Sequence, residues 1–530
     1  MAVPEWIRIM NVSTADITQS FTAATAGPAS AADALESCCA SPISTVSVFP
    51  LPLSEFEHYM LTDDRPSHPM VIVMLVDGHG SLHESLFRAA VHQLVNAHPL
   101  LNARIQNCAG QLQWVAAAPR PDGSPSSVTM EWHVTDDGDP QTQLPLARPL
   151  NLHAGECLRL QVWTGSSAGA ARWRMALEVH HACADGIAAV QLIAELLARY
   201  GRLSPDGTGI PSSTNVRRQP DFETPRPELL PGRSTLPDPE PSTAPSTSEG
   251  APRRSPGTLI GKLCRLFLRR PVRLASSHEL AAGSRTDSEH HPAILLQTLS
   301  ESSTARLRTR AIARGVTVND LLLLQCLQQI RAWNTAAGTA GARQWMRIAV
   351  PISMRSGRHS GLPACNRVSY ALVTHRMSEC SDPQSLLQRI HEKTAGLMSG
   401  REGVIAWKLF RALRRIPGGL RYMMSWWSCA GTLVLANVGD IRRRTRARFP
   451  QQDGSWQAGS VVVDRICGVS PVRPNTLAAI GVAEYGGRMT VSLRTDGTML
   501  TRQDSELFLR QFCERLESED LGVGTRTAHD

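Results

Sequence analysis

Two adjacent histidines, followed by an aspartate and a glycine, are the residues of this chain best suited to chemistry. They lie in the heptapeptide HHACADG, which runs from His180 to Gly186. Histidine titrates near neutral pH, so a neutral ring can take a proton from a hydroxyl and later return it to a leaving group. The motif therefore indicates a general-base site.

The segments around this motif must hold it in place. Residues 173–179 alternate loosely and have strand character, whereas residues 187–197 carry apolar side chains at helical spacings of three and four. The motif is thus predicted to form a turn between a strand and a helix, facing a cleft. Asp185 is poorly placed to contact a ring directly, but it can fix the turn by pairing with a distant arginine. Gly186 allows a backbone conformation that a Cβ would penalise.

A structural alternative is a buried histidine pair at the end of a strand, with Asp185 as the N-cap of the following helix. A histidine and an aspartate at this spacing alone would favour that alternative. The complete motif in its strand–turn–helix setting favours catalysis.

The motif resembles the active-site sequence of the acyl-CoA-dependent acyltransferase superfamily. That group includes chloramphenicol acetyltransferase, the condensation domains of peptide synthetases and the bacterial wax ester synthase/diacylglycerol acyltransferases. Similarity to the last branch covers roughly residues 46–200 and 290–520. It is carried by residues 52–78 (PLSEFEHYMLTDDRPSHPMVIVMLVDG), 90–105 (AVHQLVNAHPLLNARI), 148–163 (RPLNLHAGECLRLQVW), 315–333 (GVTVNDLLLLQCLQQIRAW), 350–357 (VPISMRSG), 365–373 (CNRVSYALV) and 433–440 (LVLANVGD).

The resemblance implies an α/β fold of two chloramphenicol-acetyltransferase-like lobes, with mixed β-sheets flanked by helices and an active-site tunnel between the lobes. It makes His181 the general base and gives Asp185 a structural role, with Arg355 or Arg104 as its arginine partner. His180 is expected to pack or to hydrogen-bond to the backbone. Asn437 is the candidate for stabilising the oxyanion.

The chain departs from the family at several points. Asn102 stands where relatives often place an arginine, and Asn437 to Asp440 lacks the proline of the family's Asn-Val-Pro-Gly element. No DFGWG element is present, which argues against the plant alcohol acyltransferases and condensation domains. These departures leave the substrates open.

Further candidate residues lie in the second half of the chain. Thr317 to Asp320 (TVND) opens a strongly apolar helix, so Thr317 is a predicted N-cap and Asp320 favours the helix dipole. The resemblance adds that this helix, with Asn319 and Asp320, approaches the site from the second lobe. Three residues either line the cleft or end strands: Ser353, Arg355 and Asn366.

Length and composition agree with an enzyme. The 530 residues are 42% hydrophobic, and the net charge of +8 with a pI near 9.0 suits anionic ligands such as CoA phosphates or an anionic membrane surface. No compact basic and aromatic module is present, so nucleic-acid binding is not expected. The 12 cysteines form neither a disulfide framework nor a zinc site. With no signal peptide and no apolar run long enough to span a membrane, a cytoplasmic location is expected.

Composition divides the chain into parts. Residues 1–45 are predicted to be a disordered tail, 46–205 the N-terminal lobe, 290–520 the C-terminal lobe, and 521–530 a tail. Between the lobes, residues 206–256 form a Pro/Ser-rich linker that buries too little apolar surface to order itself, and 257–289 a basic connector. Such a linker would tether the lobes without shaping the site.

Two basic amphipathic stretches have the pattern of helices that lie in a membrane interface, residues 258–270 (TLIGKLCRLFLRR) and 404–416 (VIAWKLFRALRRI). In the second, Trp407 and Phe410 oppose Lys408, Arg411 and Arg415. An ordinary helix that packs on the core and exposes an arginine face is equally compatible with the pattern. Peripheral contact with an anionic membrane or lipid droplet is therefore an expectation with a structural alternative.

The resemblance implies an O-acyltransferase that moves a fatty acyl group from acyl-CoA, its co-substrate, to a long-chain alcohol or diacylglycerol. It implies no covalent acyl-enzyme, no metal and no bound cofactor. Two alternatives stay open. One is an acyltransferase of the same superfamily that acts on a polyketide, sugar or short alcohol. The other is a catalytically silent protein that binds an acyl carrier or a lipid surface.

Overall fold

The structure is a computed structural model. It describes residues 48–118, 128–135, 138–167, 169–204, 220–235, 269–280, 293–398, 401–416, 418–426 and 431–518. Both predicted tails lie outside these ranges, as do residues 258–268 of the first amphipathic stretch and most of the predicted linker.

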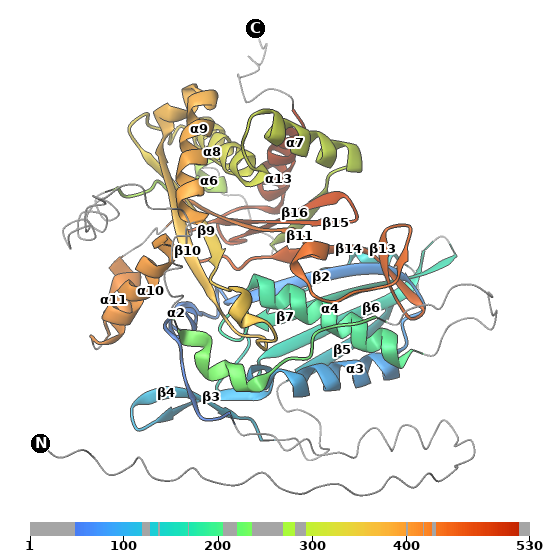
Figure 1. Cartoon of the computed structure of the whole chain (residues 1–530). Helices are drawn as coiled ribbons and strands as arrows, with labels where there is room; N and C mark the ends of the chain where they lie inside the picture. Colours follow the sequence, from blue (N-terminus) through green and yellow to red (C-terminus); the bar gives the residue numbers. More distant parts are fainter. Residues whose placement is uncertain are drawn as a thin grey trace, which may run out of the picture. The chain divides into compact units, whose positions relative to one another are not determined.

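A seven-stranded sheet forms the centre of the N-terminal lobe, with the order β12-β13-β14-β2-β7-β6-β5. Helices α3 (Glu84–Ala97) and α4 (Gly186–Leu203) pack together against it (Figure 1). The strands are β2 (Val71–Gly80), β5 (Val128–Thr135), β6 (Leu158–Ser167), β7 (Ala170–His180), β12 (Gln451–Gln452), β13 (Ser455–Ala458) and β14 (Val461–Val469).

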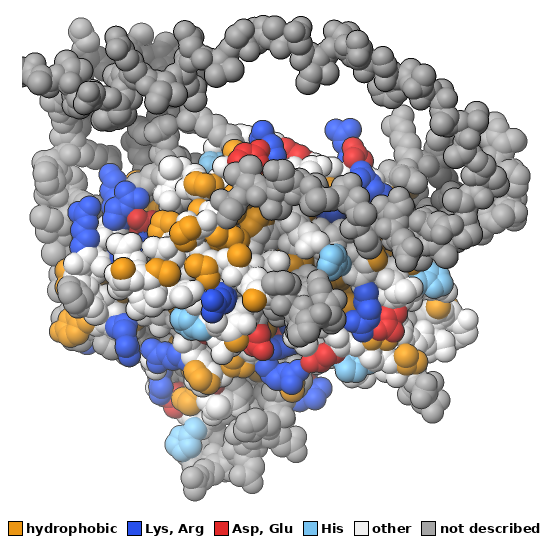
Figure 2. All heavy atoms as spheres, turned by 90° about the horizontal axis from the view of Figure 1, so that it is seen from below, with side chains coloured by type: hydrophobic (Ala, Val, Ile, Leu, Met, Phe, Trp, Pro, Cys, Tyr) orange, Lys and Arg blue, Asp and Glu red, His pale blue; other side chains and the backbone are white. Residues whose placement is uncertain are grey.

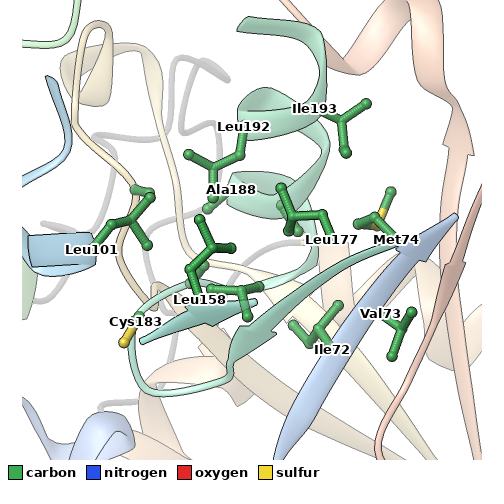
Figure 3. Close-up of a cluster of buried hydrophobic side chains, with 14 of the residues drawn as sticks. Ile72, Val73, Met74, Leu101, Leu158, Leu177, Cys183, Ala188, Leu192 and Ile193 are labelled. Atoms are coloured by element: carbon green, nitrogen blue, oxygen red, sulfur yellow. The ribbon is translucent and has the colours of Figure 1, made fainter. Parts of the chain in front are cut away.

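The central strands β2 and β7 are buried along most of their length. β2 is accordingly a long apolar run, whereas β7 also carries buried charged side chains. β7 pairs with β2 in antiparallel register from Val71 opposite His180. Leu192 and Ile193 of α4 lie beside Leu177 of β7 in the apolar core (Figure 3). The strand and helix predicted on either side of the histidine motif are thus confirmed as β7 and α4.

A smaller three-stranded sheet has the order β1-β4-β3. It consists of β1 (Leu51–Pro52), β3 (Ala103–Cys108) and β4 (Gln111–Ala116), and α2 (Glu55–Asp63) follows β1. α2 begins with a capping box, in which Ser54 and Glu57 each bond the backbone of the other.

The C-terminal lobe is built on a six-stranded sheet with the order β10-β9-β11-β15-β16-β8. Its strands are β8 (Ile294–Thr298), β9 (Trp345–Ser353), β10 (Val368–Arg376), β11 (Leu433–Asp440), β15 (Ala478–Tyr485) and β16 (Arg488–Thr495). Its helices are α6 (Ser277–Leu280), α7 (Glu301–Ala313), α8 (Val318–Ala336), α9 (Pro383–Met398), α10 (Arg401–Arg414), α11 (Gly419–Trp426), α12 (Ile441–Arg444) and α13 (Arg502–Glu517). The core of this lobe is a second apolar cluster under α8 and α13.

The chain crosses between the lobes near its end. β12 to β14 follow β11 in sequence but join the sheet of the N-terminal lobe, where β14 pairs antiparallel with β2. Asp77 of β2 accepts hydrogen bonds from Arg174 of β7 and Arg465 of β14, and both Asp77 and Arg174 are buried. A buried charge needs such partners. Residues 451–469 of the predicted C-terminal lobe therefore complete the other lobe's sheet.

β9 and β11 separate as they approach the N-terminal lobe. They are parallel and pair only at Ile348 with Leu433 and at Ala349 with Val434. Beyond this point β9 pairs with β10 and β11 with β15. Their last residues therefore belong to two separate arms of the sheet.

The second amphipathic stretch forms α10, and its apolar face packs on the protein. Trp407 is 2% exposed and donates a hydrogen bond through Nε1 to the Val368 carbonyl over 3.2 Å. Phe410 stacks on Tyr59 with ring centroids 4.8 Å apart. The packed-helix alternative therefore holds for Trp407, because α2 and β10 already bury this face.

Part of the predicted linker is ordered, which corrects the expectation that all of it lacks a packed structure. Residues 220–235, here called the strap, contain a 3₁₀ helix from Pro227 to Ser234. Arg233 of the strap is 1% exposed and forms an ion pair with Glu57, which is fully buried. Trp114 also donates a hydrogen bond to Glu57, over 3.0 Å. The Pro/Ser-rich composition of the linker gave no indication that this arginine is buried.

Basic side chains on the face shown in Figure 2 are interspersed with acidic, apolar and neutral ones. In the part of the chain that the structure describes, no helix has the length and apolar content needed to cross a membrane.

Candidate active site

The histidine motif forms a tight turn at the end of β7. The His181 N–H donates to the Met70 carbonyl over 2.7 Å, and the Cys183 N–H donates to the His180 carbonyl over 2.8 Å. Asp185 is the N-cap of α4, and its Oδ1 accepts the Ala188 N–H over 2.9 Å. The N-cap role that the structural alternative gave to Asp185 is therefore present.

Asp185 also joins the two lobes. Its Oδ2 accepts the backbone N–H of Arg367 over 2.7 Å and is bonded by the guanidinium of Arg355. Burial by itself would lower the pKa of Arg355, but the charge of Asp185 beside it raises that pKa. The predicted pairing with Arg355 is thus confirmed. Arg104 is not the partner, because its exposed side chain bonds Gln106.

His181 lies at the junction of the lobes and is 6% exposed. Asn366, which precedes β10, donates to the His181 carbonyl over 2.7 Å, and its Nδ2 lies 3.3 Å from Nδ1 of the ring. The Val368 N–H donates to Oδ1 of Asn366 over 3.1 Å, which fixes the orientation of this amide. Asn366 therefore belongs to the site.

Burial lowers the pKa of His181, although hydrogen bonds to the backbone and the charge of Asp185 act in the opposite direction. The neutral form of the ring is therefore the major one at pH 6.5, the ordinary pKa of histidine. In a neutral ring one nitrogen carries no proton, and its lone pair can accept one. That is the state that a general base requires.

His180 has a different environment. Its side chain is fully buried, and Nδ1 accepts the Ala182 N–H over 3.1 Å. Nε2 lies 3.5 Å from Oδ2 of Asp64, at the outer limit of a hydrogen bond. The expectation that His180 packs and bonds the backbone is confirmed.

Gly186 is the first residue of α4, and its φ is not positive. A Cβ built there would lie 3.7 Å from Cγ1 of Val438, an ordinary van der Waals distance. The predicted reason for a glycine, a backbone conformation that a Cβ penalises, is therefore wrong. The contact does show that β11 reaches the motif.

Asn437 and Asn319 lie together, with Nδ2 of Asn437 donating to Oδ1 of Asn319 over 3.4 Å. Oδ1 of Asn437 accepts the Gly439 N–H over 2.9 Å. These contacts occupy the amide of Asn437. Its role at the oxyanion remains a prediction.

The other predicted residues form hydrogen bonds that stabilise local structure. Ser353 is exposed at the end of β9, where its Oγ accepts the Arg355 N–H over 3.3 Å. Thr317 is the N-cap of α8, and Asp320 completes a capping box as predicted. Asp320 also accepts hydrogen bonds from His391 and Thr394 of α9. It therefore anchors α9 to α8.

Sequence reasoning missed Arg367. Its backbone binds Asp185, and its guanidinium donates to the carbonyls of Arg233 over 2.5 Å and Thr235 over 2.9 Å. Arg367 thereby joins the motif to the strap. Its position directly after Asn366, in the CNRVS segment, was the available signal.

The described residues hold no group of three or more His, Cys, Asp or Glu side chains arranged to bind a metal ion. Two cysteines lie at the site, and both are buried. Burial raises the pKa of Cys183 well above its ordinary value and that of Cys365 to about 11. Both thiols are therefore protonated at neutral pH and are poor nucleophiles.

No protein-family model and no curated protein matches this chain. Among solved structures, the first condensation domain of the calcium-dependent antibiotic synthetase aligns with a TM-score of 0.59 and 16% identity, over 89% of this chain and 96% of that chain. The SgcC5 protein from Streptomyces globisporus gives 0.54 and 15%, over 88% and 98%. The starter condensation domain of rhizomide synthetase, in complex with C8-CoA and Leu-SNAC, gives 0.53 and 13%, over 90% and 96%.

At these identities the likeness establishes the fold alone. The chain has the two-lobed mixed α/β fold of condensation domains, which confirms the predicted fold class. The structural neighbours thus include condensation domains, the branch against which the missing DFGWG element had argued.

Proposed function

We infer that this protein is an acyltransferase in which His181 activates a hydroxyl acceptor. The observation that carries the proposal is the setting of His181. Its ring is buried at the junction of the lobes, and burial favours the neutral form. Asn366 and Asp185 hold the surrounding turn against the C-terminal lobe.

The proposed reaction needs one proton relay. The His181 ring takes the proton from the acceptor hydroxyl while the oxygen attacks the thioester carbonyl carbon. The tetrahedral intermediate collapses, the carbon–sulfur bond breaks, and the proton passes from His181 to the departing thiolate. The products are an ester and a free thiol. Asp185, paired with Arg355, acts on this reaction by holding the turn in position.

We propose acyl-CoA as the donor and a long-chain alcohol or diacylglycerol as the acceptor, the substrates of the wax ester synthase/diacylglycerol acyltransferase branch. The histidine, TVND and NRVS segments support this assignment. A neighbour of the same fold has been solved with C8-CoA, which is compatible with a CoA donor. No metal or bound cofactor is part of the proposed reaction.

A second candidate is acyl transfer to a polyketide, or to an amine such as that of a peptide. It is favoured by structural neighbours that are condensation domains, among them those of the calcium-dependent antibiotic synthetase and of a polyketide synthase. The chemistry at His181 would be the same, because the base would deprotonate an attacking amine or hydroxyl. The acceptor therefore distinguishes the two candidates.

The test is an incubation of the purified full chain with labelled palmitoyl-CoA and separate acceptors: hexadecanol, diacylglycerol, a short alcohol and an aminoacyl thioester. Long-chain esters identified by mass spectrometry, with release of free CoA, would support the proposal. Amide products alone would favour the second candidate. Absence of any acylated product would favour the catalytically silent alternative.

Cytoplasmic location and peripheral contact with anionic membranes remain proposals. Because the apolar face of α10 is buried, it no longer supports membrane contact. What remains is an exposed basic face that includes Lys408 of α10 and Arg415, directly after this helix. Such a face would bind lipid by charge alone, and salt would weaken the binding.

A further inference from the structure

A dense arginine cluster lies directly after β11. Five of the seven residues from Arg442 to Arg448 are arginine, in the segment RRRTRAR. Arg443, Arg444 and Arg448 are exposed, with 88% of the Arg443 side chain accessible. Arg442 is 32% and Arg446 is 44% exposed. These residues are called the arginine rim below.

The rim is only partly neutralised by the protein itself. Among the described residues, Asp440 lies within ion-pair distance of Arg442 and Arg443, and Glu223 pairs with Arg446. Five arginines against these two carboxylates leave an excess of three positive charges. Like charges held so close repel one another unless an anion binds between them. The excess therefore points to an anionic ligand.

The rim also lies next to the candidate active site. Nε of Arg444 donates to the Val438 carbonyl over 2.9 Å. Val438 in turn reaches to within 3.7 Å of the Cβ position at Gly186 in the histidine motif. α12, which contains the first three arginines, packs against α4. One short segment thus runs from the motif to the exposed cluster.

We propose that the arginine rim binds the nucleotide phosphates of a CoA donor. This inference rests on the proposed function, because it gives the donor of that reaction its phosphate-binding residues. CoA carries its thiol at one end of a long uncharged pantetheine arm and a diphosphate with a 3′-phosphate at the other. A thioester near His181 therefore requires a cationic site outside the motif. Arginine forks bind phosphate oxygens in pairs, which suits several phosphates on adjacent residues.

The chemistry distinguishes two sources of a pantetheine donor. A phosphopantetheinyl carrier protein offers a single phosphodiester, whereas free CoA also carries the 3′-phosphate. The excess of three charges fits the larger anionic group of CoA. A rim made for a carrier would not depend on the 3′-phosphate.

The test is equilibrium binding of CoA, 3′-dephospho-CoA and pantetheine to the full chain by isothermal titration calorimetry. The variant is Arg443→Gln with Arg448→Gln, whose exposed side chains leave the core untouched. The control is Arg314→Gln with Arg502→Gln, two exposed arginines at the C-cap of α7 and in α13. Unfolding curves confirm that both variants keep the wild-type fold.

We expect the rim variant to bind CoA at least about tenfold more weakly, because its two glutamines cannot form charged hydrogen bonds with phosphate oxygens. The control should bind as the wild type does. The wild type should prefer CoA to dephospho-CoA, and more salt should weaken CoA binding in the wild type more than in the rim variant. Equal CoA affinity in the wild type and the rim variant, equal affinity for CoA and pantetheine, or no CoA binding by the wild type would each overturn the proposal.

The binding proposal for the arginine rim and the proposed function can be contradicted separately. Binding needs no turnover, so CoA bound at the rim without any acylated product would contradict the acyltransferase and leave the rim intact. Ester formation that is equally efficient in the rim variant and the wild type would do the opposite.

Discussion

The motif turn and the strap are each held by a buried ion pair, but only the pair in the turn could be predicted from the sequence. In the turn, Asp185 pairs with Arg355, and their side chains are 3% and 12% exposed. In the strap, Arg233 pairs with Glu57, and both are almost completely buried. The first pair joins the two lobes, and the second fastens a proline-rich segment to the N-terminal lobe. A buried ion pair thus holds both the motif turn and the proline-rich strap in place.

Arg367 connects these two regions. Its backbone N–H binds Asp185 and its guanidinium binds carbonyls of the strap. The strap is therefore part of what positions the histidine turn. The comparison shows that a segment's ability to fold depends on its partners more than on its average composition.

The largest effect is expected at His181. His181→Ala should lower ester formation by about 10²–10⁴-fold, because the variant lacks the proton acceptor. Steady-state rates with palmitoyl-CoA and hexadecanol measure this loss. His92→Ala, at an exposed histidine of α3, is the matched control and should retain full activity. A folded His181→Ala protein with wild-type turnover would remove His181 from the mechanism.

Asp185→Asn tests whether the motif turn depends on its ion pair. Breaking a buried pair leaves the other charge without a partner, and we expect destabilisation of about 3–5 kcal/mol together with reduced activity. Chemical denaturation and rate measurements report the two effects. Asp382→Asn, at an exposed carboxylate, controls for the chemical change. Loss of activity with unchanged stability would move Asp185 into the chemistry itself.

Arg233→Met asks the same question of the strap. Glu57 would remain buried without its arginine, so stability should fall by an amount similar to that for Asp185→Asn, about 3–5 kcal/mol. Activity should fall as well, since Arg367 relies on the strap carbonyls. Arg226→Met changes an exposed arginine of the same strap and should have little effect. If both variants behave as the wild type, the strap does not support the site.

Substitution of the buried apolar face of α10 should leave membrane binding unchanged. Trp407→Ala removes a buried side chain and should lower stability by about 3–5 kcal/mol, without changing sedimentation with anionic vesicles. Arg411→Gln breaks a half-exposed ion pair with Glu55 and should cost about 1 kcal/mol or less. Release from vesicles by Trp407→Ala in a folded protein would restore the anchor that the structure argues against.

The sequence predicted the local parts of this molecule well. The strand before His180, the helix after Asp185 and the N-cap at Thr317 depend on contacts within a few residues. The partner of Asp185 needed more, because Arg355 is 170 residues away and Arg104 was equally open to pattern reasoning. Arg367, Asp64 and Arg233 act through tertiary contacts that leave no periodic trace. The amphipathic pattern of α10 could not distinguish lipid from α2, since both cover an apolar face in the same way.

The pH dependence of kcat/KM tests the central claim most directly, because that claim is that neutral His181 takes the acceptor proton. Burial lowers the pKa of His181, so the neutral form should persist below the ordinary value of 6.5. We predict that kcat/KM declines as the pH falls, with a midpoint below pH 6.5. His181→Gln should lack this decline in its residual activity. A decline centred above pH 6.5, or one that the His181→Gln variant shares, would contradict the account.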